Sequence, residues 1–515
     1  MKKNTVFIYI LSLFILSISI HLPFLLTSDF GEQDAARIAN TAIRSYYTGY
    51  LTKEYVMYST PLYVSTLFIL LKMNILAIKY IPLFMSLLTL IASAAATLCL
   101  FIFTFRITKS KNTALAGALL LQLNPAFWFN SIYGFPTIVS LSFFFLSLVL
   151  FQEGILRQSF TSKIILFAVS LFLYMISVFT KIDAVLVTPL FCFPVWNTSA
   201  SYKTKILWCF ALCIITCLCF LSFKMYVNSF PDVSLKFDIS EWSDQFPLDF
   251  GYFCSAENRT VIARAMGFLS IPLAFIGFFF IPKQYKVLYC WVVLSMLPIV
   301  FFWGLRPGNT ARHNLFPAVL IYILLILPLL NKRVWKLWLL ALLIMSVVNY
   351  VRYPATANTA RPSGRLIRGS QWLKDGVTKL RDRAEHTLNL PFQKIAVIGQ
   401  GWQHPFYIYQ LFLRYTFSPD SFAPYHHFEY TIMDNDNLQK TFCFLYSESC
   451  GTDKIIGLHN KGYSLLIKDK DLRNDLQSAY NVEFDNEFDN EILDATALIE
   501  ALSIGTAPQD NTKED

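Results

Sequence analysis

Charged residues are scarce in this chain of 515 residues. Only 15% of the residues are Asp, Glu, Lys or Arg, whereas an ordinary soluble domain has about 25%. Apolar residues make up 55%, with 48 Phe and 26 Tyr, and uncharged runs of membrane-spanning length recur from residue 6 to residue 351. The composition therefore excludes a cytosolic enzyme, a disordered chain and a secreted disulfide scaffold.

The sequence also lacks several short signals. No run of Lys and Arg is long enough to bind nucleic acid, so no nucleic-acid partner is expected. No internal repeat and no inverted pair of broken helices of the transporter kind is present. The apolar run after Lys2 and Lys3 resembles a signal peptide. Because no small-residue cleavage site follows it, we interpret it as an uncleaved first span.

The apolar runs predict an all-α polytopic membrane domain over residues 1–351, with about eleven transmembrane helices. The segment 60–78 is also apolar, but Pro61, Lys72 and Asn74 divide it into pieces shorter than the ~20 residues that a bilayer needs. An interfacial or re-entrant helix is expected there. The eleven expected spans are 6–26, 81–104, 113–130, 137–151, 164–180, 183–197, 206–228, 265–281, 287–303, 313–330 and 334–351.

The distribution of Lys and Arg predicts the orientation, because these residues in short loops are retained in the cytoplasm during insertion. Up to and including Arg352 the chain has 27 Lys/Arg and 12 Asp/Glu, and after it 16 and 22. The cations occur in alternate loops, and of the first 12 acids only Glu153 lies in one of these loops. We therefore expect a multi-pass protein of the cell inner or plasma membrane, with a cytoplasmic N-terminus and an extracytoplasmic tail.

The tail is predicted to form a small extracytoplasmic α/β domain over 352–502, followed by a disordered tail over 503–515. Cys443 and Cys450 are seven residues apart, and an oxidising compartment permits a disulfide between them. Two free thiols are an equal alternative. The patterns predict strands at 394–399, 441–446 and 463–467 and helices at 406–415 and 491–502.

Two further patterns in the tail are weak. The string Gly399-Gln-Gly-Trp-Gln-His404 follows a predicted strand, but it lacks the third Gly of a nucleotide-binding fingerprint. His404, His426 and His427 lack the spacing of metal ligands. We therefore expect structural histidines here, with no cofactor and no metal site.

The first external segment carries the strongest candidate for chemistry. It places Asp29, Glu32 and Asp34 within six residues directly after a span, at the start of a predicted helix. A carboxylate at a helix N-terminus is stabilised by the helix dipole, so a capping role is one interpretation. The other is a functional role for one of these carboxylates.

Several strings in 1–350 resemble the type C glycosyltransferase superfamily, whose members are polytopic enzymes that use polyprenyl-phosphate-linked sugars. Gly31-Glu-Gln-Asp-Ala-Ala-Arg-Ile-Ala39 resembles the acidic first loop of that group, and Ser59-Thr-Pro-Leu-Tyr63 resembles the end of that loop. Other similar strings are Leu123–Pro136, which resembles a third span with its turn, Lys181-Ile-Asp, which resembles an Arg-Pro-Asp string, and Arg312-His-Asn-Leu-Phe-Pro317, which resembles a late Arg-Tyr-Leu-x-Pro string.

The resemblance implies roles for the acidic residues. In the family, the acid of the first loop acts as a general base on the acceptor. The matching residues here are Asp34 first, Glu32 second and Asp29 third. The resemblance thus implies sugar transfer from a polyprenyl-phosphate donor to an extracytoplasmic acceptor, which is a lipid, a glycan or a protein.

The departures from the family narrow this expectation. The external turn 131–136 has no acid, whereas members that hold a metal against a diphosphate usually have one there. The Trp-Trp-Asp-Tyr-Gly string of oligosaccharyltransferases is also missing. These departures favour a lipid monophosphate donor and metal-independent chemistry, closest to the protein O-mannosyltransferase and lipid A aminoarabinose transferase branch.

The donor phosphate requires cations at the same membrane surface. Lys181, Arg306, Arg312 and His313 lie on predicted external turns at the ends of spans, and we expect them to bind this phosphate. Contact of these cations with lipid head groups is the alternative. For the whole chain, a transporter or a lipid or polysaccharide flippase remains the alternative function, although only Lys224 lies well inside an apolar run.

Overall fold

The computed structural model describes residues 3–25, 30, 33–51, 60–230, 248–306, 311–352, 387, 390, 392–399, 404–415, 417, 429–433, 439–446, 452–468, 470–480, 484–485 and 492–493. These residues belong to two compact units. The first unit comprises Met1–Ala35 with Tyr55–Val377, and the second comprises Ala36–Glu54 with Thr378–Asp515.

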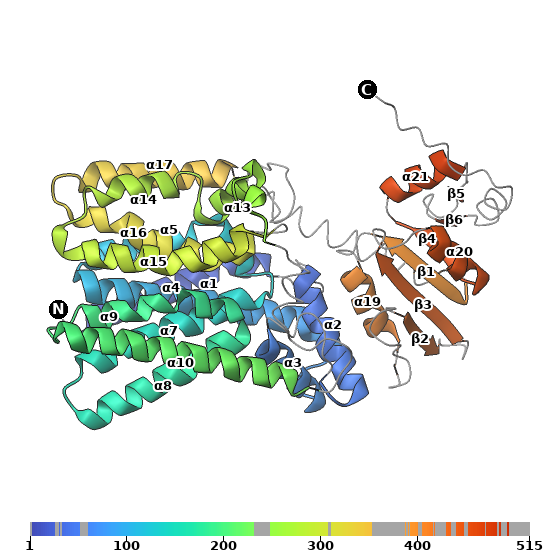
Figure 1. Ribbon diagram of the computed structural model, residues 1–515, viewed down its shortest axis with the longest axis horizontal. Coiled ribbons are helices and arrows are strands. Elements are labelled where there is room, and N and C mark those ends of the chain that lie inside the picture. Colours follow the sequence, from blue (N-terminus) through green and yellow to red (C-terminus); the bar gives the residue numbers. More distant parts are fainter. Residues whose placement is uncertain are drawn as a thin grey trace. The chain divides into compact units, whose positions relative to one another are not determined.

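The first unit is a bundle of apolar helices that run side by side (Figure 1). Within the described residues, five helices are long and apolar enough to cross a membrane, or six if one bent pair is a single span. The chain is therefore a multi-pass membrane protein, and the predicted number of eleven spans stays a prediction. The five helices are Ile78–Thr108, Pro136–Leu156, Phe160–Thr180, Tyr202–Asn228 and Lys283–Gly304.

The other predicted spans correspond to shorter helices. The segment 60–78, for which no span is expected, contains α3 with only 12 residues, too few to cross a bilayer. The helices that start in this unit are α1 (Lys3–His21), η1 (Leu22–Phe24), α2 (Gln33–Thr48), α3 (Pro61–Lys72), η3 (Ile78–Tyr80), α4 (Ile81–Thr108), α5 (Lys111–Gln122), α6 (Pro125–Asn130), α7 (Pro136–Leu156), α8 (Phe160–Thr180), η4 (Ile182–Phe191), α9 (Cys192–Trp196), α10 (Tyr202–Asn228), α12 (Phe250–Phe253), α13 (Ala256–Met266), α14 (Ser270–Phe278), η5 (Lys283–Tyr285), α15 (Lys286–Gly304), η6 (Ala311–Asn314), α16 (Leu315–Ile326), η7 (Leu327–Leu330) and α17 (Trp335–Arg352).

Local sequence explains why three predicted spans are interrupted. Segment 113–130 divides at Asn124, whose side chain caps α6 by accepting from the Phe127 amide at 2.8 Å. The helices α13 and α14 meet at 72°, because Gly267 adopts a φ of 101° that other residues rarely take. Segment 183–197 begins as the ten-residue 3-10 helix η4, which is long for this type of helix.

The buried polar groups of the bundle link helices that are distant in sequence. The Asn124 side-chain amide donates to the Ala265 carbonyl and to the Tyr322 hydroxyl, both at 3.0 Å. The side chains of Ser147 and Ser170 each donate to the other's backbone carbonyl, which joins α7 to α8. Because such groups are costly to bury unpaired, these bonds favour one packing of the bundle.

The second unit contains a mixed six-stranded sheet with the order β2-β3-β1-β4-β6-β5. The central strand β1 pairs in parallel with β3 and β4, and the three outer pairings are antiparallel. The elements are β1 (Lys394–Gly399), α19 (His404–Arg414), β2 (Glu429–Met433), β3 (Gln439–Tyr446), α20 (Thr452–Asn460), β4 (Ser464–Ile467), α21 (Lys470–Tyr480), β5 (Phe484–Asp485) and β6 (Ile492–Leu493).

The strands of this unit were easier to predict than its C-terminal end. β1, β3, β4 and α19 occur where the pattern predicts them, but Ile492–Leu493 forms a strand instead of the start of a helix. This short segment pairs with Leu465 and Leu466 of β4, a long-range contact that overrides helical periodicity. Cys443 is buried in β3, while Cys450 lies outside the described residues, so the disulfide stays a prediction.

The second unit also includes most of α2. The helix starts in the first unit with Gln33, but the residues from Ala36 onward belong to the second unit. There, the Tyr47 ring lies 6.2 Å from the Phe412 ring and 5.5 Å from the Phe417 ring. The helix that begins at the acidic first segment is thus packed by residues of the C-terminal region.

Candidate functional site

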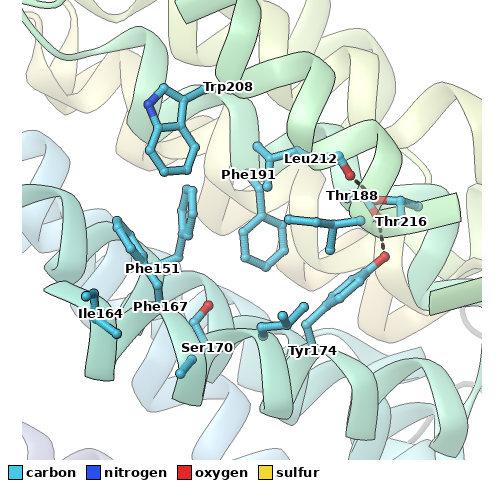
Figure 2. Close-up of a pocket in the computed structure, with 13 residues that line it drawn as sticks. Phe151, Ile164, Phe167, Ser170, Tyr174, Thr188, Phe191, Trp208, Leu212 and Thr216 are labelled. Atoms are coloured by element: carbon cyan, nitrogen blue, oxygen red, sulfur yellow. Dashed lines mark hydrogen bonds between the residues drawn. The ribbon is translucent and has the colours of Figure 1, made fainter. Parts of the chain in front are cut away.

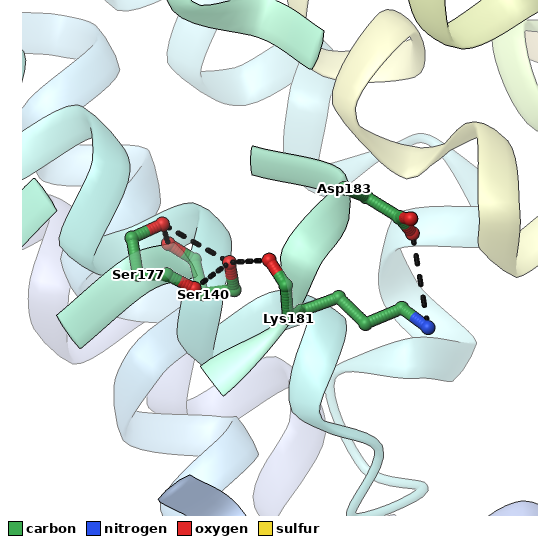
Figure 3. Close-up of polar contacts among 4 residues, drawn as sticks. All are labelled: Ser140, Ser177, Lys181 and Asp183. Carbon is green, nitrogen blue, oxygen red and sulfur yellow. Dashed lines mark hydrogen bonds and ion pairs between the residues drawn. The ribbon is translucent and has the colours of Figure 1, made fainter. Parts of the chain in front are cut away.

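Lys181 occupies the break between α8 and η4, at one end of the bundle. Its backbone is extended there, with φ −156° and ψ 115°. Figure 3 shows how two serines fix this break: the hydroxyls of Ser140 and Ser177 each donate to the other's backbone carbonyl at 2.8 Å, and the Ser140 hydroxyl also donates to the Lys181 carbonyl at 3.4 Å. The sequence therefore positions Lys181 by polar contacts between α7 and α8.

The Lys181 ammonium forms an ion pair with Asp183. Their nearest charged atoms are 3.8 Å apart, and their side chains are only 5% and 1% exposed (Figure 3). The Nζ atom also lies 5.5 Å from the ring centre of Phe135 and 5.9 Å from that of Trp303. A cation between two aromatic rings is held by electrostatic attraction to their faces, so Lys181 has little freedom to leave the pair.

The turn before α7 contributes Phe135. Gly134 has a φ of 73°, a conformation that favours glycine, and an added Cβ would lie 2.8 Å from the Cβ of Met85. The Tyr63 hydroxyl donates to the Gly134 carbonyl at 3.1 Å. These contacts fix the turn close to α3 and α4 and hold the neighbouring Phe135 ring beside Lys181.

Arg306 follows the end of α15 and is only 8% exposed. It donates to the Phe302 carbonyl at 2.8 Å, and its guanidinium carbon lies 3.8 Å from the centre of the Phe302 ring. Burial lowers the pKa of Arg306, and the Asp183 carboxylate acts in the opposite direction. The cation remains charged, because an arginine pKa starts far above neutrality.

Trp303 connects these charges to His313. The two rings are stacked almost parallel, with centres 3.7 Å apart and planes 9° apart. Trp303 lies in the last turn of α15, and His313 lies in η6 directly before α16. The stack therefore links the end of α15, next to Arg306, with η6, which contains His313.

The cluster contains buried polar atoms with open bonding capacity. Lys181 and Arg306 are the two cations that act on the Asp183 carboxylate. The Trp303 indole and the Lys181 ammonium also approach the Asp183 carboxylate as hydrogen-bond donors, although within the described residues neither contact has ordinary hydrogen-bond geometry. Buried groups in that state are rare in proteins, and a polar ligand is one explanation for them.

The structure brings together three of the predicted phosphate ligands, Lys181, Arg306 and His313, around Asp183 and Trp303. Asp34 lies partly exposed in the first turn of α2, where a carboxylate is favoured by the helix dipole. The remaining predicted residues, Glu32, Asp29 and the side chain of Arg312, lie outside the described residues.

The sequence prediction assigned no role to Asp183. The residue stands in the string that resembles an Arg-Pro-Asp motif, at the start of a predicted span. A carboxylate at the edge of an apolar run, two residues from a lysine, was the available signal, because charges are rarely placed there without a function.

His404 of the second unit is a buried histidine that the sequence predicted to be structural. His404 is buried at the start of α19, with its ring 5.8 Å from Phe444. Burial lowers its pKa to about 3, helped by the charge of Arg37, so this imidazole is neutral near neutral pH. Within the described residues, no group of three His, Cys, Asp or Glu side chains is placed to hold a metal ion.

The fold of this chain is similar to that of several solved membrane-protein structures, two of which are structures of ArnT. The structure of ArnT from Cupriavidus metallidurans bound to undecaprenyl phosphate aligns with a TM-score of 0.52 and 11% identity, over 95% of this chain and 97% of that one. ArnT of the same organism in the apo state gives the same score and identity, over 94% and 96%.

The comparison confirms the predicted resemblance at the level of the fold, because ArnT is the lipid A aminoarabinose transferase of the branch that the sequence strings favoured. At 11% identity, the likeness concerns the fold alone. No protein-family model matches the sequence, and no curated protein matches it.

Proposed function

We propose that this chain is an integral membrane glycosyltransferase that moves a sugar from a polyprenyl-phosphate donor to an extracytoplasmic acceptor. The buried cluster of Lys181, Asp183 and Arg306 carries the proposal, because it gathers cations at one end of an ArnT-like bundle. The undecaprenyl phosphate in the ArnT structure supports a lipid of this class as the donor carrier.

The reaction needs two kinds of group. An acceptor oxygen attacks the anomeric carbon of the sugar while the bond from that carbon to the phosphate oxygen breaks, and the phosphate leaves with the electron pair. We assign the removal of the acceptor proton to Asp34 as general base, with Glu32 second and Asp29 third. Metal-independent transfer is part of this proposal.

The leaving phosphate gains negative charge as its bond breaks. Lys181, Arg306, Arg312 and His313 are proposed to stabilise this charge, and the Trp303 indole is a further donor beside them. Fixed donors act more strongly in a site that excludes water, and the buried position of Lys181 and Arg306 meets that condition. Asp183 is then a positioning residue, which holds Lys181 and Arg306 in place.

The proposal is tested with the full-length protein in nanodiscs. The donors are a panel of undecaprenyl-phosphate hexoses and pentoses, and membranes of a deletion strain supply the acceptor. Wild-type protein should release undecaprenyl phosphate, measured by mass spectrometry, and the deletion strain should accumulate its lipid-linked sugar. Chelation of divalent metals should leave the rate unchanged. Movement of intact donor between leaflets without cleavage would instead identify a flippase.

The role of Asp34 has its own test. Asp34→Asn should lower transfer by ~10²-fold or more, the usual size of a general-base effect, and should leave binding of undecaprenyl phosphate intact. Asp34→Glu keeps the base and should recover part of the rate. Wild-type turnover by Asp34→Asn would remove this residue from the mechanism.

A further inference from the structure

An apolar pocket lies between α7, α8, η4 and α10, away from the charged cluster. It has a volume of about 360 Å³, within the range of about 300–1,000 Å³ that is usual for pockets that bind small ligands. Figure 2 shows the rings of Phe151, Phe167, Phe191 and Trp208 on its walls, with Tyr174 and Thr188 at one end.

The hydroxyl groups of the pocket wall are already paired. The hydroxyls of Tyr174 and Thr188 share a hydrogen bond at 2.6 Å, and the Thr216 hydroxyl donates to the Leu212 carbonyl at 2.8 Å. The Ser170 hydroxyl donates to the Ser147 carbonyl at 2.9 Å. The walls therefore present hydrocarbon and aromatic faces, which favour a hydrocarbon ligand over a polar one.

The pocket is open toward the side of the bundle. Its lining includes large exposed side chains, namely Ile164 at 50%, Leu171 at 38% and Trp208 at 39%. They lie on α8 and α10, the two long apolar helices that are buried least by the rest of the protein. In a bilayer such a face is covered by lipid chains, so a chain can enter the pocket from the side.

The pocket shares two elements with the charged cluster. η4 carries Asp183 at its start and Thr188 in the pocket wall, which at ~2.0 Å per residue are ~10 Å apart. α8 carries Tyr174 in the wall seven residues before Lys181, which at ~1.5 Å per residue is also ~10 Å. Both estimates place the near end of the pocket ~10 Å from the charged cluster.

The distance from the charged cluster to the far end of the pocket indicates how long a bound lipid chain must be. Along α8 the pocket continues to Ile164, which is ~25 Å from Lys181 at ~1.5 Å per residue. One leaflet contributes only ~15 Å of the hydrocarbon core. A lipid with its phosphate at the cluster reaches the far end of the pocket only if its chain crosses the midplane.

We infer that the apolar pocket between α7, α8, η4 and α10 binds the polyprenyl tail of the lipid whose phosphate is bound by the Lys181–Arg306 cluster. The identity of this lipid rests on the proposed function. Branched isoprenoid units fit the aromatic walls, where ring pairs such as Phe151 with Phe191 and Phe167 with Trp208 lie 5.4 and 5.8 Å apart. The tail then anchors the donor for the reaction at the other end of η4.

A photolabelling experiment tests this inference without requiring sugar transfer. The probe is undecaprenyl phosphate with a diazirine in the distal half of the tail, bound to the full-length protein in nanodiscs. Mass spectrometry should map the label to peptides that contain Phe167 or Trp208. Excess unlabelled undecaprenyl phosphate should compete with it.

Two matched variants of α8 provide the control. Ala168→Trp adds an indole at a position that lines the pocket, whereas Val169→Trp adds the same group at the next position, which is also exposed but is not part of the wall. Ala168→Trp should lower labelling of these peptides about tenfold, which corresponds to about two lost methylene contacts. Val169→Trp should label like the wild type. Ile215→Trp, on the α10 wall, repeats the test if Ala168→Trp folds poorly.

The outcomes separate the tail pocket from the proposed function. Equal labelling of wild type and Ala168→Trp would overturn the inference even if sugar transfer occurs. Labelling that is displaced by excess diacyl phospholipid, but not by undecaprenyl phosphate, would assign the pocket to a phospholipid chain and would also overturn it. Failure of sugar transfer with correct labelling would count against the proposed function alone.

Discussion

Two charged clusters lie toward opposite ends of α7, and they differ in burial and in geometry. Near the C-terminal end of α7, Glu153 contacts Arg106 at 2.8 Å and Arg157 at 2.7 Å, with the three side chains 21%, 29% and 57% exposed. Near its N-terminal end, Lys181 and Asp183 are almost fully buried, and their charged atoms are 3.8 Å apart. The charged atoms are thus closer together in the exposed cluster than in the buried one.

This difference supports the proposed role of the buried cluster. Exposed pairs with good geometry contribute at most about 1 kcal/mol each. A buried pair loses hydration, and its attraction repays that loss only if good hydrogen bonds complete the site. Within the described residues, Trp303 and Lys181 approach the Asp183 carboxylate as donors, but neither contact has good hydrogen-bond geometry. The Lys181–Asp183 pair is poorly built for stability, which is expected if a ligand phosphate is its third partner.

The largest expected effect comes from removing the cations of the buried cluster. Lys181→Met and Arg306→Gln should each lower sugar transfer by about 10²–10³-fold, the usual cost of losing one donor to a developing negative charge. Arg312→Ala should behave similarly, while Arg312→Lys keeps the charge but loses the fork and should retain part of the rate. The measurement is release of undecaprenyl phosphate under saturating donor.

Arg157→Gln, in the exposed cluster, is the matched control. It removes one cation at the other end of the bundle and should leave transfer unchanged. Near-wild-type rates in all the buried-cluster variants would show that these residues are interfacial cations and that the phosphate site lies elsewhere.

A double variant sharpens the comparison. Lys181→Met alone leaves the Asp183 carboxylate buried without its nearest cation, and breaking a buried pair in this way typically costs about 3–5 kcal/mol of stability. Lys181→Met with Asp183→Asn removes both charges, so thermal stability should recover while transfer stays low. Thermal unfolding in nanodiscs and the rate of transfer are measured on the same samples.

This pattern separates a functional pair from a structural one. If stability and transfer recovered together, the pair would act only in folding. Asp183→Asn alone, with Lys181 and Arg306 present, should lower transfer by about tenfold through less accurate placement of the cations, because small misplacements are costly in catalysis. Asp183→Glu should restore part of that loss.

The cations of the buried cluster were named from the sequence, but its anion was missed. Lys181 and Arg306 stand out because they lie at the ends of apolar runs on the predicted external face, and this position depends only on the order of spans. Their approach to the same carboxylate depends on the packing of η4 against α15. No sequence pattern contains that long-range contact.

The fold shows the same division. Apolar runs predicted long helices such as α7 and α10 closely, because burial in lipid decides them. The break at Gly267 and the 3-10 form of η4 depend on single residues and on tertiary contacts, so the predicted spans 265–281 and 183–197 appeared continuous. The short strand at Ile492–Leu493 exists only through pairing with β4.

The smallest expected effect concerns the exposed cluster itself. Glu153→Gln removes both ion pairs of Glu153 at once, yet Arg106 keeps its bond to the Val149 carbonyl at 3.3 Å. The loss of stability should be at most about 1 kcal/mol per pair, because both pairs are partly exposed to solvent. Sugar transfer should remain at the wild-type rate.

Salt dependence completes this prediction. The difference in thermal stability between wild type and Glu153→Gln should shrink as ionic strength rises, because salt screens exposed pairs more than buried ones. The difference between wild type and Lys181→Met should persist, because a 5% exposed side chain is little affected by mobile ions. Unfolding curves at low and high salt measure both. If the Glu153 difference proved large and insensitive to salt, or if transfer fell with it, the exposed cluster would be the one on which the protein depends, and the contrast between the two ends of α7 would have to be reversed.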